Sequence, residues 1–93
     1  AELLDLLGDE YTRNVFEAVA EKPRSGRAVA EAADVSRPTA YRRLNELHDA
    51  GLVRTKMMIS ENGHHREQFE AIAESFSLSL DDGCLEAIVS ITK

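Results

Sequence analysis

The side chains best suited to chemistry lie between positions 36 and 43, where arginines alternate with hydroxyl groups and one aromatic ring. The DNA major groove admits one helix and presents donors and acceptors that Arg, Ser and Thr side chains match. Arg42 is expected to pair with a guanine edge, and Thr39 to offer its hydroxyl or methyl group. Ser36 and the amide groups around it suit a phosphate. The candidate DNA contacts of this segment are Ser36, Arg37, Pro38, Thr39, Tyr41, Arg42 and Arg43.

These candidates belong to a predicted recognition helix over about residues 37–50. Ser36 is a natural N-cap, and Pro38 falls in the first turn, where its missing N–H costs nothing. Arg43 lies nearer the apolar stripe, so a contact to the DNA backbone is expected there. Tyr41 either contacts a base or sugar or only shields a helix end. The stripe is Ala40, Leu44 and Leu47, which leaves Arg37, Pro38, Tyr41, Arg42 and Asn45 outward.

A second group of basic side chains flanks residues 60–63, Ser-Glu-Asn-Gly. Asn-Gly is a strong signal for a tight turn, and the apolar period changes from helical to alternating around it. Residues 52–72 are therefore predicted to form a two-stranded wing. Its candidate contacts to phosphates or to a minor groove are Arg54, Lys56, His64, His65 and Arg66. The adjacent histidines point to opposite faces of a strand, so they are not expected to share a metal ion.

Three further helices are predicted before the recognition helix, over residues 2–7, 10–21 and 27–33. Asp9 is the expected N-cap of the second. Apolar spacing predicts which of their side chains face the core. These are Tyr11, Val15, Ala18 and Val19 in the second helix and Ala28, Val29 and Ala32 in the third.

The last segment, about residues 75–91, alternates apolar and polar residues on both sides of Asp81-Asp82-Gly83. A second β-hairpin is predicted here, with a terminal helix as the alternative. At the other end of the chain, Leu3, Leu4, Leu6 and Leu7 form an apolar patch, and such a patch usually finds a partner. A homodimer is therefore predicted, formed through Leu3, Leu4 and Leu7 together with the C-terminal segment.

Length and charge limit the classes of protein to which this chain can belong. The 93 residues suit one domain and are too few for a two-lobed enzyme or a large barrel. The net charge is −6, yet residues 22–66 carry nine Lys or Arg and five Asp or Glu, whereas the flanks carry two and twelve. Net positive charge thus falls on the segment that contains the predicted recognition helix and most of the wing. The order of elements predicts a winged helix-turn-helix over residues 1–93, a mainly α fold with a β-hairpin wing (α+β).

Other functional classes lack a sequence signal. No activated nucleophile, glycine-rich phosphate loop or metal-ligand spacing is present, so no enzyme activity, cofactor or metal is expected. Cys84 is the single cysteine, so a reducing, cytoplasmic location is expected. Its side chain is expected to be buried as a small apolar group. Apolar stretches fall far short of the roughly 20 residues of a membrane span, so no membrane contact is expected.

Several motifs together resemble one family. They are LLGDEY (6–11), SRPTAYRRL (36–44), GLV (51–53), NGHH (62–65) and FEA (69–71). The sequence is similar in these motifs to the ArsR-like winged helix-turn-helix regulators of haloarchaea, and its acidic, Arg-rich composition is similar to that of proteins from salt-loving archaea. The resemblance implies a dimeric DNA-binding regulator with residues 36–44 in the major groove. It departs from the metal-sensing members, which carry a cysteine pair in the recognition helix.

Two functional hypotheses follow. The leading one is a sequence-specific transcriptional regulator that binds double-stranded DNA as a homodimer. The alternative is a winged-helix module that uses the same helix face to bind an acidic protein. Removal of Arg37 and Arg42 discriminates between them, because only the first hypothesis expects a strong loss of DNA affinity.

Overall fold

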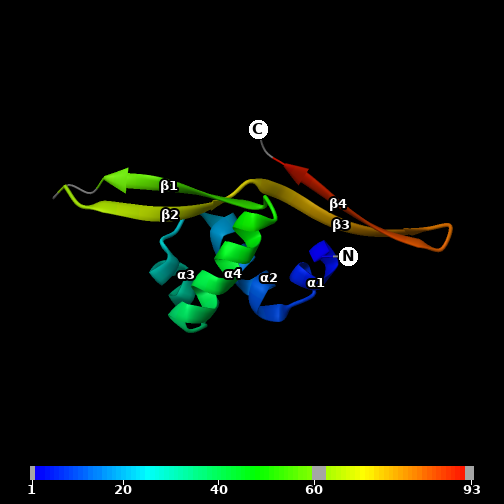
Figure 1. Ribbon diagram of the computed structural model, residues 1–93, viewed down its shortest axis with the longest axis horizontal. Coiled ribbons are helices and arrows are strands. Elements are labelled where there is room, and N and C mark those ends of the chain that lie inside the picture. The colour runs from blue at the N-terminus through cyan, green and yellow to red at the C-terminus, as the bar shows by residue number, and fades with distance from the viewer. Residues whose placement is uncertain (1, 60–62, 92–93) are drawn as a thin grey trace.

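The protein folds as four helices followed by two β-hairpins (Figure 1). The computed structural model describes residues 2–59 and 63–91, so Ser60, Glu61 and Asn62 of the predicted wing turn lie outside the described residues. Strands β1 and β2 form one antiparallel sheet, and β3 and β4 form another. The predicted winged helix fold is thereby confirmed. The elements are α1 (Glu2–Leu7), α2 (Glu10–Glu21), α3 (Gly26–Ala33), α4 (Arg37–Asp49), β1 (Val53–Ile59), β2 (His65–Ala71), β3 (Ala73–Asp81) and β4 (Cys84–Ile91).

Each of the three longer helices begins at a side chain that caps its N-terminus. Asp9 accepts the amide of Thr12 at 2.9 Å, and Ser25 accepts the amide of Ala28 at 3.2 Å. Ser36 accepts the amide of Thr39 at 3.2 Å, which confirms the predicted start of α4. Because these caps satisfy amides that have no partner within the helix, short polar residues determine where the helices begin.

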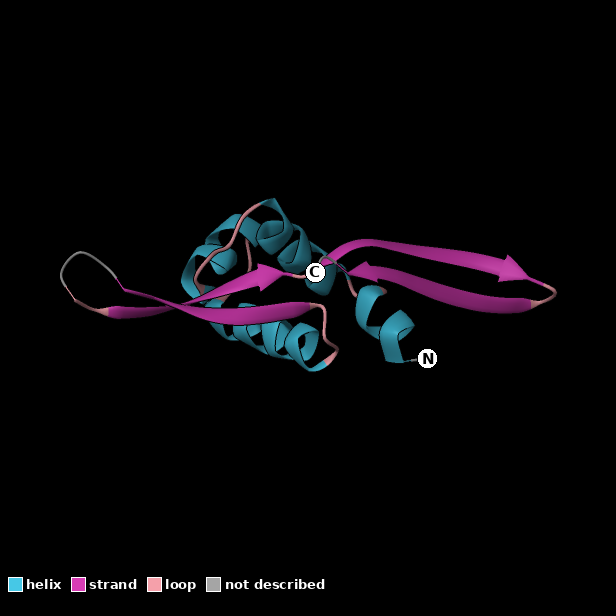
Figure 2. Cartoon of the chain, turned by 90° about the horizontal axis from the view of Figure 1, so that it is seen from above, coloured by secondary structure: helices cyan, strands magenta, loops and turns pink. Residues whose placement is uncertain are grey.

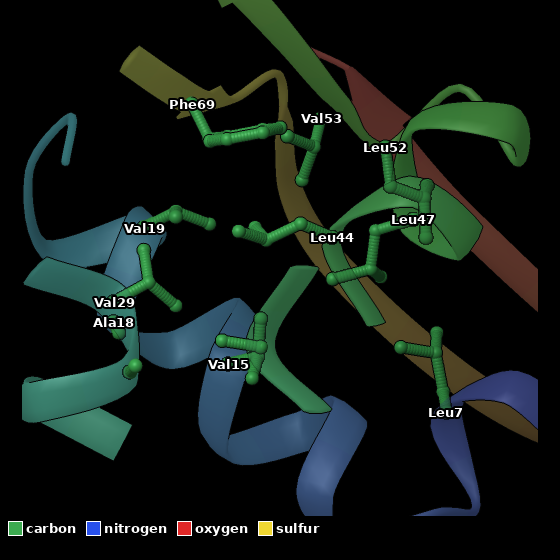
Figure 3. Packing of buried hydrophobic residues seen from close by; sticks show 12 residues of the cluster. Leu7, Val15, Ala18, Val19, Val29, Leu44, Leu47, Leu52, Val53 and Phe69 are labelled. Carbon is green, nitrogen blue, oxygen red and sulfur yellow. The ribbon is translucent and has the colours of Figure 1, made fainter. Parts of the chain in front are cut away.

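The core lies between α2, α3, α4 and the base of the first hairpin (Figure 3). Phe69 and Val53 bring β2 and β1 into this core, and the predicted inward stripe of α4 is confirmed as buried. Arg24, between α2 and α3, pairs with Phe69 through two backbone hydrogen bonds of 3.1 and 2.7 Å. The hairpin β1–β2 is therefore fixed to the helices by both side chains and backbone. The core residues are Leu7, Val15, Ala18, Val19, Val29, Ala30, Ala40, Leu44, Leu47, Leu52, Val53 and Phe69.

Some predicted inward positions are wrong. Tyr11 is exposed, and Thr12 is buried in its place, because the Thr12 hydroxyl donates to Asp9 at 3.0 Å and so enters the core with its hydrogen bond made. In α3 the buried alanine is Ala30, whereas Ala32 is exposed and Ala28 half-buried.

The predicted dimer contact and the lone cysteine also need correction. Leu7 is a core residue, so it is not available to a partner. Leu4 is half-buried, and the side chain of Leu3 lies outside the described part of the chain. Cys84 is exposed rather than buried, because it follows the turn at the far end of the second hairpin.

The segment over residues 73–91 is a hairpin, as predicted, and the alternative of a terminal helix is wrong. Asp82 and Gly83 both have positive φ, 51° and 78°, which is the backbone of the tight turn that matches strand twist. The hairpin extends from the helices in the direction opposite to β1–β2 (Figures 1 and 2). The molecule is consequently elongated, with extents of 57 × 29 × 19 Å. No helix in the described part is both long and apolar enough to cross a membrane.

Candidate nucleic-acid interface

The N-terminal end of α4 combines a polar cap with exposed side chains. Ser36 accepts the Thr39 amide and donates its own hydroxyl hydrogen to Thr39 Oγ1 at 2.9 Å. This reciprocal pair fixes the Thr39 side chain, while Arg37 and Pro38 beside it are exposed. The positive end of the helix dipole lies at the same place, so this end of α4 attracts anionic groups.

The outward face of α4 is polar, basic and aromatic, as predicted. Arg37, Tyr41, Arg42 and Asn45 are all exposed, on the side opposite the buried stripe of the helix. Arg42 lies 3.6 Å from Glu46, in an exposed ion pair one helical turn apart. Such pairs contribute at most about 1 kcal/mol, so Arg42 can leave Glu46 for a stronger partner.

Tyr41 is held in place by residues far from it in sequence. Its ring lies edge-on to Phe69 of β2, with ring centroids 6.3 Å apart and an interplanar angle of 74°. A Cβ atom at position 26 would overlap the Tyr41 ring, so only glycine allows the ring to lie against the start of α3. Tyr41 therefore connects α3, α4 and the wing while remaining 42 % exposed.

Arg43 differs from its neighbours on α4, because its side chain is only 21 % exposed. Its Nε lies 3.3 Å from Oδ2 of Asp9, in ion-pair contact without hydrogen-bond alignment. Its Nη1 donates to both carboxylate oxygens of Glu46, at 3.2 and 3.3 Å. Arg43 thus joins α4 to the cap of α2.

Asp9 is the acidic partner in this contact. The pKa of its carboxyl is lowered, first by the hydrogen bond from the Thr12 amide and then by the Thr12 hydroxyl and the nearby Arg43 and Arg13, while partial desolvation opposes the shift. The ionised form of Asp9 is therefore the one that the fold stabilises.

The basic residues of the wing lie on two faces. Arg54 donates from Nε to Glu70 at 3.0 Å, and Lys56 lies 3.9 Å from the same carboxylate. Arg66 is paired in register with Met58, and His65 with Ile59, so these two residues point to opposite faces. His64 precedes β2 and is exposed. Among the described residues no group of three or more His, Cys, Asp or Glu side chains is placed to hold a metal ion.

The predicted separation of charge has a spatial counterpart. The net positive segment, residues 22–66, forms α3, α4, β1 and the start of β2. These elements occupy one half of the long molecule, and α1 and β3–β4 occupy the other (Figure 1). The sequence did not reveal that Gly26, Phe69 and Asp9 orient the face of α4. Asp9 was predicted only as a helix cap, and the Ser-Gly pair at residues 25–26 indicated a helix start rather than a contact with Tyr41.

The helices, the adjoining hairpin and the exposed face of α4 define a winged-helix protein. The chain belongs to the HVO_A0261 N-terminal domain family, whose sequence model matches residues 2–74. This match includes all four helices and the wing, and it ends near the start of β3.

In structure the chain is similar to a possible transcriptional regulator from Methanosarcina mazei Go1. The TM-score is 0.63 at 12 % sequence identity, and the match covers 78 % of this chain and 64 % of that one. At this identity the likeness shows a shared fold. No curated protein matches the sequence.

Proposed function

We propose that the protein is a sequence-specific, DNA-binding transcriptional regulator, related to the ArsR-like regulators of haloarchaea, that acts as a homodimer. In this proposal α4 lies in the major groove and β1–β2 is a wing on the backbone or the minor groove. The observation that carries the proposal is the exposed, arginine-bearing face of α4 beside a fixed hairpin in a winged-helix fold. A DNA-binding regulator of this kind acts in the cytoplasm, where archaeal chromosomes lie.

The predicted site residues take different roles in this proposal. Arg42 and Thr39 contact base edges, whereas Ser36, Arg37 and Pro38 surround a phosphate at the start of α4. Tyr41 packs on a sugar or base. Arg43 positions α4 through Asp9, because both of its neighbouring carboxylates would have to be released before it reached DNA. The proposed contacts of the wing are Arg54, Lys56, His64, His65 and Arg66.

Fluorescence anisotropy tests the proposal directly. Labelled duplexes that tile the region upstream of the protein's own gene are titrated with protein across rising potassium chloride, beside scrambled duplexes of the same composition. A regulator binds one native duplex more tightly than its scrambled partner, and the preference persists at high salt. Equal, weak binding that disappears with salt contradicts the proposal and favours the protein-interaction module.

A matched pair of variants locates the contact. Arg37→Ala with Arg42→Ala should weaken binding to the preferred duplex by about tenfold to a hundredfold, because a good contact to a base contributes about 1–3 kcal/mol. Arg13→Ala removes a positive charge from α2, outside the proposed interface, and should change affinity by less than about twofold. Equal effects of the two changes would show that only overall charge matters.

The homodimer part of the proposal rests on the second hairpin. Its backbone register places three apolar pairs on one face and the serines, Glu86 and Ile88 on the other. An isolated two-stranded hairpin is marginally stable in water, so a second copy that covers the apolar face would stabilise both. Helix α1, with half-buried Leu4, lies beside the base of this hairpin (Figures 1 and 2). The apolar pairs are Phe76–Val89, Leu78–Ala87 and Leu80–Leu85.

Light scattering tests the dimer. Leu80→Glu places a charge on the proposed contact face and should convert dimers into monomers, with weaker DNA binding as a consequence. Ser79→Glu adds the same charge at the neighbouring position, which belongs to the opposite face, and should leave the mass unchanged. A monomeric wild-type protein, or an unchanged mass for Leu80→Glu, would refute this contact.

A further inference from the structure

The wing exposes three consecutive large apolar side chains. Met57 is 58 % exposed, Met58 44 % and Ile59 70 %. They are the last three residues of β1, a strand whose outer end extends beyond the helices (Figure 1). Exposed apolar residues on a two-stranded ribbon favour aggregation, and proteins that keep them usually use them for binding.

These residues are divided between the two faces of the hairpin. Alternation along β1 puts Met57 and Ile59 on the same face as Val53, which is buried in the core. That face is therefore the one turned towards the helices. Met58 belongs to the opposite face, together with Arg54 and Lys56. We refer to Met57 and Ile59 as the wing strip.

The wing strip continues the exposed surface of α4. Tyr41, partly exposed on α4, lies edge-on to Phe69 of β2. Phe69 is paired in register with Thr55, and Met57 is the next residue of β1 on that face. One surface thus runs from the outward side of α4 through Tyr41 to the wing strip.

The wing itself carries little net charge to attract phosphates. Its described residues, 53–59 and 63–71, include three Lys or Arg and two Glu. Two of the basic residues, Arg54 and Lys56, lie against the single carboxylate of Glu70. The wing therefore adds mainly apolar area to the basic face of α4.

We infer that the wing strip makes an apolar contact in the DNA minor groove next to the major groove that holds α4, an inference that rests on the proposed function. Isoleucine and methionine are among the side chains that proteins insert at base steps in the minor groove. The seven residues of β1 span about 23 Å. Half a helical turn of DNA is about 17 Å, so the wing is long enough to reach the neighbouring groove.

Salt dependence separates this contact from that of α4. In the full chain, Met57→Ser with Ile59→Ser should weaken binding to the preferred upstream duplex by about tenfold or more, because apolar area stays in water. The slope of log affinity against log salt should not change, since no phosphate contact is lost. Arg37→Ala, which removes a proposed phosphate contact at the start of α4, should lower the magnitude of that slope by up to about one.

Met58→Ser is the matched control, because Met58 is the neighbouring residue on the other face of β1. On that face the proposed contacts are the charged ends of Arg54, Lys56 and Arg66 on phosphates, and no apolar side chain is proposed to enter the groove. It should change affinity by less than about twofold, and thermal unfolding should show all three proteins equally folded. The inference is overturned if the Met57 and Ile59 double variant binds DNA as tightly as the wild-type protein, or if Met58→Ser loses as much DNA affinity as the double variant. If Arg42→Ala still weakens DNA binding in that case, the proposed function stands and only the contact of the wing strip is refuted.

Base analogues test the groove itself. Inosine in place of guanine in the flanking half-turn removes the amino group from the minor groove and leaves the major groove unchanged. Wild-type affinity should respond to this exchange, and the Met57 and Ile59 double variant should respond less. A wild-type protein that ignores the exchange at every flanking position overturns the minor-groove contact.

Discussion

The two hairpins leave the helices in opposite directions and are stabilised in different ways (Figure 1). The base of β1–β2 enters the core through Val53 and Phe69 and is joined to Arg24 by backbone hydrogen bonds. In β3–β4 the first residue, Ala73, packs against the core, whereas Leu80 and Ile88 further along are 73 % and 51 % exposed. A hairpin whose base packs into the domain core can position a binding surface, whereas a hairpin that extends away from the core would gain stability from a partner that covers it.

The two hairpins also differ in charge. The wing belongs mostly to the net positive segment, whereas residues 73–91 contain four Asp or Glu and no Lys or Arg. An acidic ribbon is repelled by DNA phosphates, and the basic half of the molecule is attracted to them. The direction of each hairpin therefore agrees with the division of labour that we propose, DNA binding for one and self-association for the other.

The largest expected effect comes from removing the anchor of the wing. Phe69→Ala should lower the free energy of unfolding by about 3–5 kcal/mol, because it deletes a buried aromatic ring shared by β2 and the helices. That is a large share of the roughly 5–15 kcal/mol that stabilises a typical domain. Ile88→Ala, in the second hairpin, should change it by less than about 1 kcal/mol. Urea unfolding followed by circular dichroism measures both, and equal losses would contradict the difference between the hairpins.

Much of this architecture could be predicted from local sequence. Asp9, Ser25 and Ser36 determine where helices begin, and the Asp-Asp-Gly turn determines where the second hairpin reverses. These features depend on residues within four positions of one another, so a sequence displays them completely. The inward stripe of α4 was predictable for the same reason.

The parts that orient the site depend on contacts between distant residues. Gly26, Tyr41 and Phe69 meet only because α3, α4 and β2 pack together, and no spacing in the sequence predicts that meeting. In the sequence Arg43 cannot be told from the exposed arginines beside it. Only the packing of α2 against α4 places Asp9 next to it. The sequence shows that Met57 and Ile59 are apolar. That they share a surface with Tyr41 follows only from the register of the hairpin.

The next largest effect compares one glycine near each hairpin. Gly26→Ala should cost about 1–3 kcal/mol, because the added methyl group displaces the Tyr41 ring from its place beside Phe69. Gly83→Ala, which has space but a φ of 78°, should cost about 1 kcal/mol. Thermal unfolding measures both. The cost of Gly26→Ala should largely disappear when Tyr41 is also alanine, and a strictly additive double variant would show that the ring is not the obstacle.

A smaller, pH-dependent effect is expected at Asp9, which joins the helices that carry the wing. Because its pKa is lowered in the folded state, Asp9 contributes stability above the pKa of an unfolded aspartate, about 4. That contribution decreases as the pH falls through the lower, folded pKa. Asp9→Asn keeps a capping side chain but should remove this part of the acid destabilisation. Acid titration monitored by circular dichroism compares it with Asp82→Asn in the second hairpin, and identical curves would exclude a role for the Asp9 charge.

The smallest effect concerns the charge of the wing. Glu70→Gln removes the carboxylate shared by Arg54 and Lys56, whose exposed ion pairs contribute at most about 1 kcal/mol to folding, so stability should change little. DNA affinity should rise severalfold at low salt, with a steeper salt slope, because the two cations become available to phosphates. Glu86→Gln makes the same change in charge on β4 and should leave both quantities unchanged. Equal gains in DNA affinity from the two variants would mean that affinity depends only on the net charge of the protein. The difference between its two hairpins would then have no part in DNA binding.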